Sequence, residues 1–403
     1  MAQLEMIIAF TLILAGNSAW SQQPTAPPGD TVHHPPALTP RTQEERDRAY
    51  QAAHHTILNV LVTDGSGKPA HGLREKDFTV LDNGQPRPLA TFRAVEGSKG
   101  IAPTRIILML DAVNNTPKEI ANDRKGVENF LAQSQDAQNP AQLAYPTSIG
   151  FLTAAGASVS KASRDRASVQ GQLHQLTDTV TPFACAQKGG DEMEEIPIFQ
   201  GNAGTNITAV DRPVKKTNNC DGDRYRLSVA ALKHLVEQQQ YEQGRAILVW
   251  IGKSWPLLPH NEAKVNSTGL RQNLFDNLAV ISNAMREGQV TVDAVFVPDQ
   301  LRNLEQRSDH DNRFFNGVAT ENEMTASSLG LQMLAHQSGG LVLIDGKDLA
   351  AEIAQCVADA QLYYALSFEL PPAGSPGEFH SLEVKTDDPA LTVRTNTNYY
   401  AEP

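Results

Sequence analysis

The stretch TRIILMLDAVNNT, residues 104–116, is where the sequence first suggests chemistry. An apolar run ends there at Asp111 and is followed by Asn114 and Asn115. In open α/β sheets, ligands bind beyond the carboxyl ends of the strands, so a polar side chain that closes a buried strand belongs near such a site. Carboxylate and amide oxygens are the ligands that hard divalent cations prefer in proteins. The stretch is therefore a candidate site for Mg²⁺ or Ca²⁺.

Further donors could come from the residues after the apolar run RAILVWI, residues 245–251, because ligands in an open α/β sheet bind at the carboxyl ends of the strands. The residues found there are Gly252, Lys253 and Ser254. A lysine close to the ion would repel it by roughly several kcal/mol at intermediate dielectric. The shortage of oxygen donors predicts a degenerate site that binds no ion.

Two carboxylates, Asp221 and Asp223, lie just before a helix that we expect to begin at residue 224. If an ion does bind, its predicted ligands are Asp111, Asn115 and Asp223. The alternative is structural: Asp223 caps the helix, and the two asparagines satisfy backbone groups at their turn.

Strands and helices alternate from about residue 104 to 360, which predicts βαβ crossovers and a mainly parallel, doubly wound sheet covered on both faces. Each strand is a short apolar run, and each helix repeats apolar residues at intervals of three and four. The predicted strands are 105–110, 147–153, 245–251, 290–297 and 341–344; the predicted helices are 117–133, 164–176, 224–240, 270–285, 324–338 and 349–360.

Both chain ends have a β pattern instead. Asp64-Gly65 and Asn83-Gly84 supply hairpin turns in the first end. The last strands are too few to be stable alone, so we expect them to pair with the N-terminal ones in a small β-sandwich. The predicted domains are 1–21 signal peptide, 22–53 Pro-rich linker, 54–96 N-terminal β module, 102–370 α/β domain and 371–403 C-terminal β strands.

The N-terminus carries an apolar run from Ile7 to Gly16, followed by Ala19 and Ser21 at positions suited to signal cleavage. The run is shorter than the roughly 20 residues that span a bilayer. Glu5 and the lack of a basic residue before the run leave two alternatives, an N-terminal anchor or a misplaced start codon. We expect an exported protein, periplasmic, cell-surface or secreted, with no membrane span in the mature chain.

The 403 residues carry a formal charge of −12, which argues against nucleic acid as a partner because phosphate binding needs clustered Lys and Arg. Cys185 and Cys220 bracket a long polar insert. In an exported chain they could form a disulfide worth at most ~4 kcal/mol, and two free thiols are the alternative. Cys356 has helical spacing with Leu349 and Ile353, typical of a buried core residue.

Several segments in one order resemble the bacterial VWFA-related family, which has the von Willebrand factor type A fold. They are VTDGSGKPAHGLREKDFTVLDNGQPRPLATF, LMLDAVNNTPKEIANDRKGVENFL, GRAILVWIGKSWP, LAHQSGGLVLI, and the ending YYALSFELPP, FHSLEVKT and NYYA. The resemblance implies a metal-ion-dependent adhesion site with the pattern Asp-x-Ser-x-Ser, a loop Thr and a later Asp. Asp111 matches the first position, whereas Val113 and Asn115 replace the serines and Lys253 stands near the second aspartate.

The expected function is an exported, non-enzymatic protein-interaction module. Its partner, a protein of unknown identity, would bind at the carboxyl edge of the sheet, at Asn114, Lys253 and Ser254, without a cofactor. One alternative is a divalent-cation-dependent adhesin or ligand-binding protein that uses Asp111. A remote alternative is a hydrolase that uses Asp111 with Asp221 or Asp223 as acid and base.

Overall fold

The computed structural model describes residues 55–96, 103–134, 136, 139–180, 183, 193–202, 206–215, 220–253, 255, 268–296, 317–324, 328–344 and 347–401. All of them belong to one compact unit, residues 37–403.

A seven-stranded sheet forms the centre of the α/β part, with the order β13-β12-β11-β5-β6-β7 and β8 paired to β6. The pairs from β13 to β6 are parallel, and β7 and β8 run antiparallel to β6. This confirms the predicted mixed α/β class with a mainly parallel sheet. The strands are β5 (Arg105–Asp111), β6 (Gln142–Thr153), β7 (Gly156–Val159), β8 (Ser163–Asp165), β11 (Ala246–Gly252), β12 (Val290–Phe296) and β13 (Val342–Leu343).

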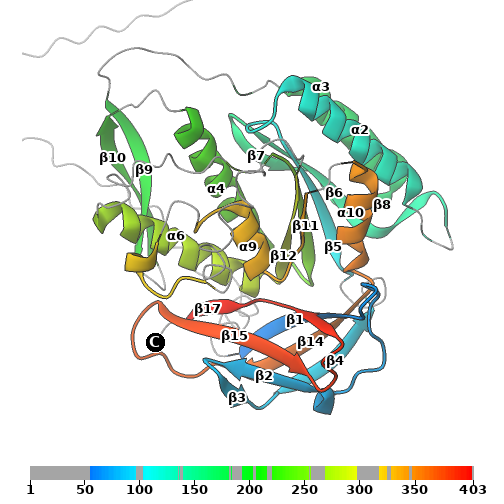
Figure 1. Ribbon diagram of the computed structural model, residues 1–403. Helices are drawn as coiled ribbons and strands as arrows, with labels where there is room; N and C mark the ends of the chain where they lie inside the picture. Colours follow the sequence, from blue (N-terminus) through cyan, green and yellow to red (C-terminus); the bar gives the residue numbers. More distant parts are fainter. Residues whose placement is uncertain are drawn as a thin grey trace, which may run out of the picture. The chain divides into compact units, whose positions relative to one another are not determined.

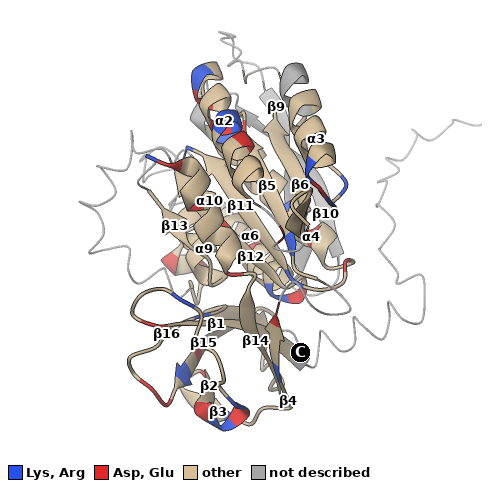
Figure 2. Ribbon diagram, turned by 90° about the vertical axis from the view of Figure 1, so that its right-hand side faces the viewer, with Lys and Arg blue, Asp and Glu red and all other residues tan. Residues whose placement is uncertain are grey.

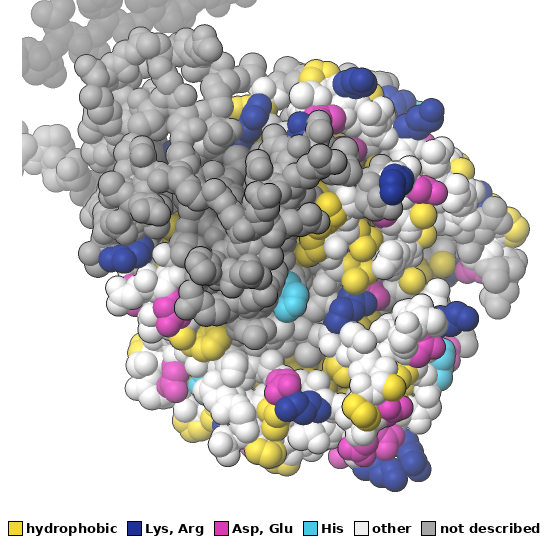
Figure 3. All heavy atoms as spheres, viewed as in Figure 1, with side chains coloured by type: hydrophobic (Ala, Val, Ile, Leu, Met, Phe, Trp, Pro, Cys, Tyr) yellow, Lys and Arg dark blue, Asp and Glu magenta, His cyan; other side chains and the backbone are white. Residues whose placement is uncertain are grey.

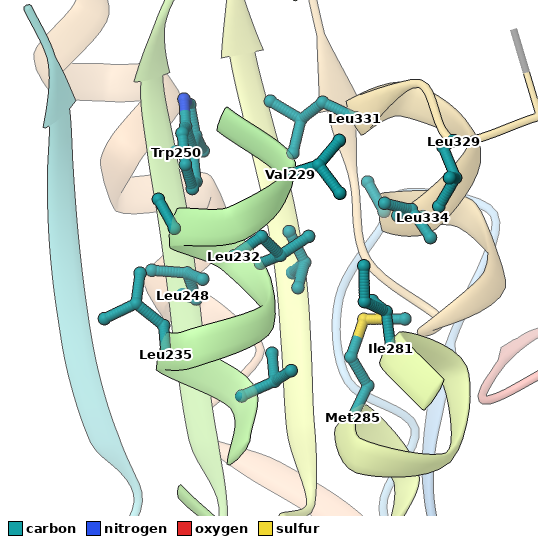
Figure 4. Close-up of a cluster of buried hydrophobic side chains, with 14 of the residues drawn as sticks. Val229, Leu232, Leu235, Leu248, Trp250, Ile281, Met285, Leu329, Leu331 and Leu334 are labelled. Carbon is teal, nitrogen blue, oxygen red and sulfur yellow. The ribbon is translucent and has the colours of Figure 1, made fainter. Parts of the chain in front are cut away.

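Helices cover both faces of this sheet (Figure 1). One face carries α2 (Pro117–Gln133), α3 (Arg166–Thr179) and α10 (Leu349–Ala358), and the other α4 (Cys220–Gln239), α6 (Thr268–Glu287) and α9 (Leu331–Gln337). Successive side chains of a strand point to opposite faces, so Ile247 and Val249 of β11 pack on the face covered by α2, α3 and α10. Leu248 and Trp250 pack on the opposite face, in the cluster shown in Figure 4. The central strands are mostly free of charged residues (Figure 2).

Helix α2 begins where the sequence predicts, because its first turn is capped in three ways. Thr116 and Glu119 form a reciprocal capping box, and Pro117 occupies a first-turn position where no N–H is needed. Two other helices differ from prediction. Helix α4 begins at Cys220, four residues before the predicted start at 224. The helix predicted over 324–338 is short, because Gly330 is extended and α9 starts only after it.

Strands from the two chain ends pair with each other in two four-stranded antiparallel sheets. Most of their buried apolar side chains form one cluster, to which both sheets contribute. The first sheet has the order β16 (Thr392–Arg394), β1 (His55–Thr63), β14 (Leu362–Glu369) and β4 (Thr91–Glu96); the second has β17 (Asn398–Ala401), β15 (Glu378–Thr386), β2 (Phe78–Asp82) and β3 (Gln85–Arg87).

Two local details qualify the sequence predictions here. Strand β14 pairs with β1 and β4, although the predicted boundary at residue 370 assigns it to the α/β domain. The β2–β3 hairpin turns at Asn83 and Gly84, whose φ values of 49° and 73° are those that an Asn-Gly hairpin turn requires.

The insert between α3 and α4 contains an antiparallel hairpin, β9 (Met193–Asn202) and β10 (Asn206–Lys215). Cys185 lies outside the described residues, and Cys220 is the first residue of α4 with no described side chain, so their pairing stays a prediction. Cys356 is buried, as its helical spacing predicts. Among the described helices, none combines the length and the apolar character needed to cross a bilayer.

Candidate functional site

Asp111 is the last residue of β5, at the carboxyl edge of the parallel sheet. Its neighbours in the sheet are β11, which ends at Gly252, and β6, where Leu152 lies opposite Asp111. The chain turns immediately after Asp111 and enters α2 at Pro117. Three chain segments therefore meet around one carboxylate that is 1% exposed.

Four N–H groups donate to the two oxygens of Asp111. The backbone N–H groups of Val113 and Asn114 donate to Oδ1 at 3.0 and 2.9 Å. The Asn114 amide and the indole Nε1 of Trp250 donate to Oδ2 at 2.6 and 3.0 Å. Burial raises the pKa of the Asp111 carboxyl group above its usual value, and these donors oppose part of the rise.

The two asparagines connect Asp111 to the surrounding helices. The side-chain amide of Asn114 also donates to Oγ of Ser228 on α4, at 2.9 Å. The amide of Asn115 donates to Oδ2 of Asp123 on α2, and its Oδ1 accepts the backbone N–H of Lys253 at 2.8 Å. Asn115 thus ties the loop after β11 to the first helix.

Asp123 was not singled out by the sequence, although it is buried beside the candidate site. Burial, followed by the charges of Glu119 and Asp111, raises the pKa of Asp123 to about 7. The only signal for it in the sequence is its place on the inner face of α2, one turn after Glu119.

Lys253 and Glu119 form an ion pair at the mouth of the site, with Nζ and Oε1 2.8 Å apart and both side chains 19% exposed. Burial opposes ionisation of Glu119, but Lys253 and the N–H of Thr116 outweigh it and lower the pKa of this carboxyl group. Gly252 allows the end of β11 to pack closely against Asn115 and Asp111, because a Cβ at position 252 would lie 2.9 Å from Nδ2 of Asn115 and 3.0 Å from Cβ of Asp111.

The structure brings together Asp111, Asn114, Asn115 and Lys253 of the predicted site residues. Asp223 instead forms an ion pair with Arg226 in the first turns of α4. Ser254 lies outside the described residues, and the side chain of Asp221 is not described. The sequence missed Trp250 and Ser228, because an indole in a strand and a serine in a helix resemble ordinary core and surface residues.

The hydrogen bonds around Asp111 use both of its carboxylate oxygens. Both carboxylate oxygens face N–H hydrogens, whose partial positive charge repels a cation. These hydrogens also occupy the lone pairs with which the oxygens would coordinate a cation. Where the type A pattern has a serine hydroxyl, Val113 has an apolar side chain without an oxygen, and its backbone N–H donates to Asp111. Within the described part of the chain, no cluster of three or more His, Cys, Asp or Glu is placed to hold a metal.

Replacing Trp250 with phenylalanine should lower the free energy of unfolding by roughly 2 kcal/mol, because Asp111 loses one N–H donor while the aromatic packing is largely kept. Urea denaturation of the single and double variants measures this. In an Asp111→Ala background the same change should cost at least ~1 kcal/mol less. Equal costs in both backgrounds would show that the indole hydrogen bond contributes nothing.

Comparisons with known proteins identify no relative of this chain. No protein-family model matches it, and no curated protein does. Solved structures with some likeness include the human COPII-coat protein Sec24c, at 10% identity and a TM-score of 0.36, covering 84% of this chain and 48% of that one. Two crystal structures of proximal thread matrix protein 1 from the mussel byssus have 13% identity and TM-scores of 0.31, covering 68% and 69% of this chain and 49% and 51% of theirs.

The chain thus spans about half the length of the solved chains that it matches. TM-scores this low do not establish a shared fold, and they carry no argument about function.

Proposed function

We propose that the chain is an exported, non-enzymatic protein-interaction module of the bacterial VWFA-related family. The type A-like fold is supported by the parallel sheet with Asp111 at its carboxyl edge and helices on both faces. We interpret the two antiparallel sheets, which share one apolar cluster, as a β-sandwich built from both chain ends.

We propose further that partner binding at the carboxyl edge needs no metal. The observation that carries this is the saturation of the Asp111 oxygens by four N–H donors. In a metal-dependent site the ion links the loops of the edge. In this chain Asn115 and Lys253 supply that link, through the backbone hydrogen bond and the ion pair with Glu119. A rigid sheet edge whose loops present polar groups is suited to binding another protein.

The surface charge fits a protein partner better than a nucleic acid. On the described surface seen in Figure 3, basic and acidic side chains are interspersed and the basic ones form no single patch. The formal charge of −12 adds a general repulsion of phosphate backbones.

Titration with Mg²⁺, Mn²⁺ and Ca²⁺ tests the metal-free site. We expect no binding heat at millimolar concentrations of cation and no change of the melting temperature. A divalent-dependent adhesin, the alternative, predicts stabilisation of about 2.7 kcal/mol at a cation concentration of 100 Kd. Such a shift, abolished in Asp223→Ala or Asn115→Ala, would contradict the proposal.

Photo-crosslinking tests the proposed binding edge. A photoreactive residue is introduced at Ala154, which is exposed and follows β6 two residues after Leu152, the neighbour of Asp111. The control position is Tyr241, 60% exposed near the amino end of β11. In cells that produce the protein, we expect one dominant adduct from position 154, unchanged by EDTA, and none from position 241. Equal adducts from both positions, or adducts lost with EDTA, would refute metal-free binding at this edge.

A further inference from the structure

The α/β part and the antiparallel sheets are joined by the polar contacts of three arginines, of which Arg245 and Arg286 are buried and Arg394 is partly exposed. Arg245 is fully buried before β11 and stacks 4.9 Å from the ring centre of Tyr363 on β14. Arg286 of α6 is 5% exposed, donates to Oγ1 of Thr56 at 3.0 Å and lies 5.7 Å from the ring centre of Tyr399. Both arginines reach from the α/β part towards the antiparallel sheets.

Arg394 of β16 reaches in the opposite direction. It donates to both carboxylate oxygens of Asp359, at 2.7 and 2.8 Å, and to the carbonyl oxygen of Gly339 at 3.0 Å. Asp359 caps the end of α10, and its carbonyl oxygen accepts a hydrogen bond from Nη1 of Arg245 at 2.7 Å. Guanidinium groups from the two parts therefore hold one residue between them.

Asp293 is a fully buried carboxyl group in the middle of β12, and it contacts the segment 339–341, whose Gly339 accepts the hydrogen bond of Arg394. The backbone N–H of Leu341 donates to its Oδ1 at 2.7 Å. Its Oδ2 accepts no hydrogen bond from the described residues. An ionised carboxylate in that position is costly, because burial removes the water that would solvate it.

We propose that Asp293 is a proton-sensitive latch for the junction, by which we mean the contacts of Arg245 and Arg394 with Asp359. Protonated Asp293 favours the closed junction, and ionised Asp293 favours its opening. Opening lets water reach the buried Asp293 carboxylate and the buried guanidinium group of Arg245. A junction made of buried charges opens at lower cost than an apolar one, because separation restores the hydration of each charge.

The electrostatic environment supports this assignment. Burial, followed by the charge of Asp359, raises the pKa of Asp293 to about 7, against the opposing effects of the Leu341 N–H, Arg394 and Arg245. The thiol of Cys356 on α10 also lies near Asp293. The pKa of this thiol is raised by burial first and then by the charge of Asp293.

The direction of the pH dependence follows from the raised pKa of Asp293. The closed form binds the Asp293 proton more tightly than the open form, whose pKa is close to the ordinary 3.8. The stabilisation of the closed form is therefore complete below about pH 4, falls as the pH rises, and is lost above about pH 7.

Labelling of Cys356 tests the latch. The thiol is fully buried beside Asp293 in the core between α10 and the sheet, so a thiol reagent reaches it only when the end of α10 that carries Asp359 moves away from the sheet. On the purified full chain, labelling of Cys356 is followed by peptide mass spectrometry from pH 5 to 8.5 and divided by the rate for a free thiol at each pH. We expect the opening constant to rise by up to ~100-fold between pH 5 and 7 and to level off above pH 7.

Two variants complete the test. Asp293→Asn copies the protonated state, and its corrected labelling should not depend on pH. Asp276→Asn removes another acid of raised pKa, on α6, and should keep the wild-type profile. The proposal is overturned if Asp293→Asn keeps the wild-type profile. If the Asp293→Asn chain does not fold, the wild-type chain decides alone, because a flat profile there also overturns it.

Discussion

Replacing Asp111 with alanine is expected to lower the free energy of unfolding by roughly 3 to 5 kcal/mol. The substitution removes the acceptor of four buried N–H groups, and those of Val113 and Trp250 lose the partner that the structure gives them. The loss should be the same with EDTA and with Mg²⁺, because the carboxylate acts as a hydrogen-bond acceptor. Urea denaturation in the two buffers measures it.

Asp223→Ala is the matched control, because Asp223 is the second carboxylate that the sequence proposes as a metal ligand. Its ion pair with Arg226 is exposed by about two fifths on each side, so its removal should cost less than ~1 kcal/mol. Asp111→Asn should be nearly as damaging as alanine, since its amide would turn hydrogens towards N–H donors. If Asp111→Ala is well tolerated in EDTA, the carboxylate does not have the structural role that we assign to it.

Replacing Gly340 with alanine should cost roughly 3 kcal/mol or more, or prevent folding. A Cβ at this position would overlap the carbonyl oxygen of Val292 and lie 2.8 Å from Oδ1 of Asp293. The first of these atoms is backbone of β12 and cannot move away without disturbing the strand. Thermal unfolding and the yield of soluble protein report the effect.

Gly171→Ala provides the opposite expectation. Gly171 lies within α3, and a Cβ there meets no atom within 4 Å. Alanine should therefore stabilise the protein by about 0.5 to 1 kcal/mol through the lower entropy of its unfolded chain. Equal effects of the two glycine substitutions would contradict the close packing of Gly340 against β12.

Local patterns in the sequence were sufficient for most of the α/β part. The apolar run before Asp111 and the capping residues Thr116 and Glu119 determine β5 and the start of α2, because strand burial and helix capping depend on residues a few positions apart. The Asn83-Gly84 turn is local in the same way. The start of α4 and the length of α9 were less predictable, since a helix boundary depends on weak differences between neighbouring residues.

By itself, the sequence determined the alternation of strands and helices, the place of Asp111 at a strand end, and the scarcity of oxygen donors near it. Only the tertiary structure decided what Asp111 binds, because Trp250 lies 139 positions away and its N–H reaches the carboxylate only when β11 and β5 are aligned in register. The same holds for Arg394 and Asp359, which meet only when the last strands return to β1. Such contacts carry no periodic signal, since they depend on which strands become neighbours and on the direction in which each side chain points.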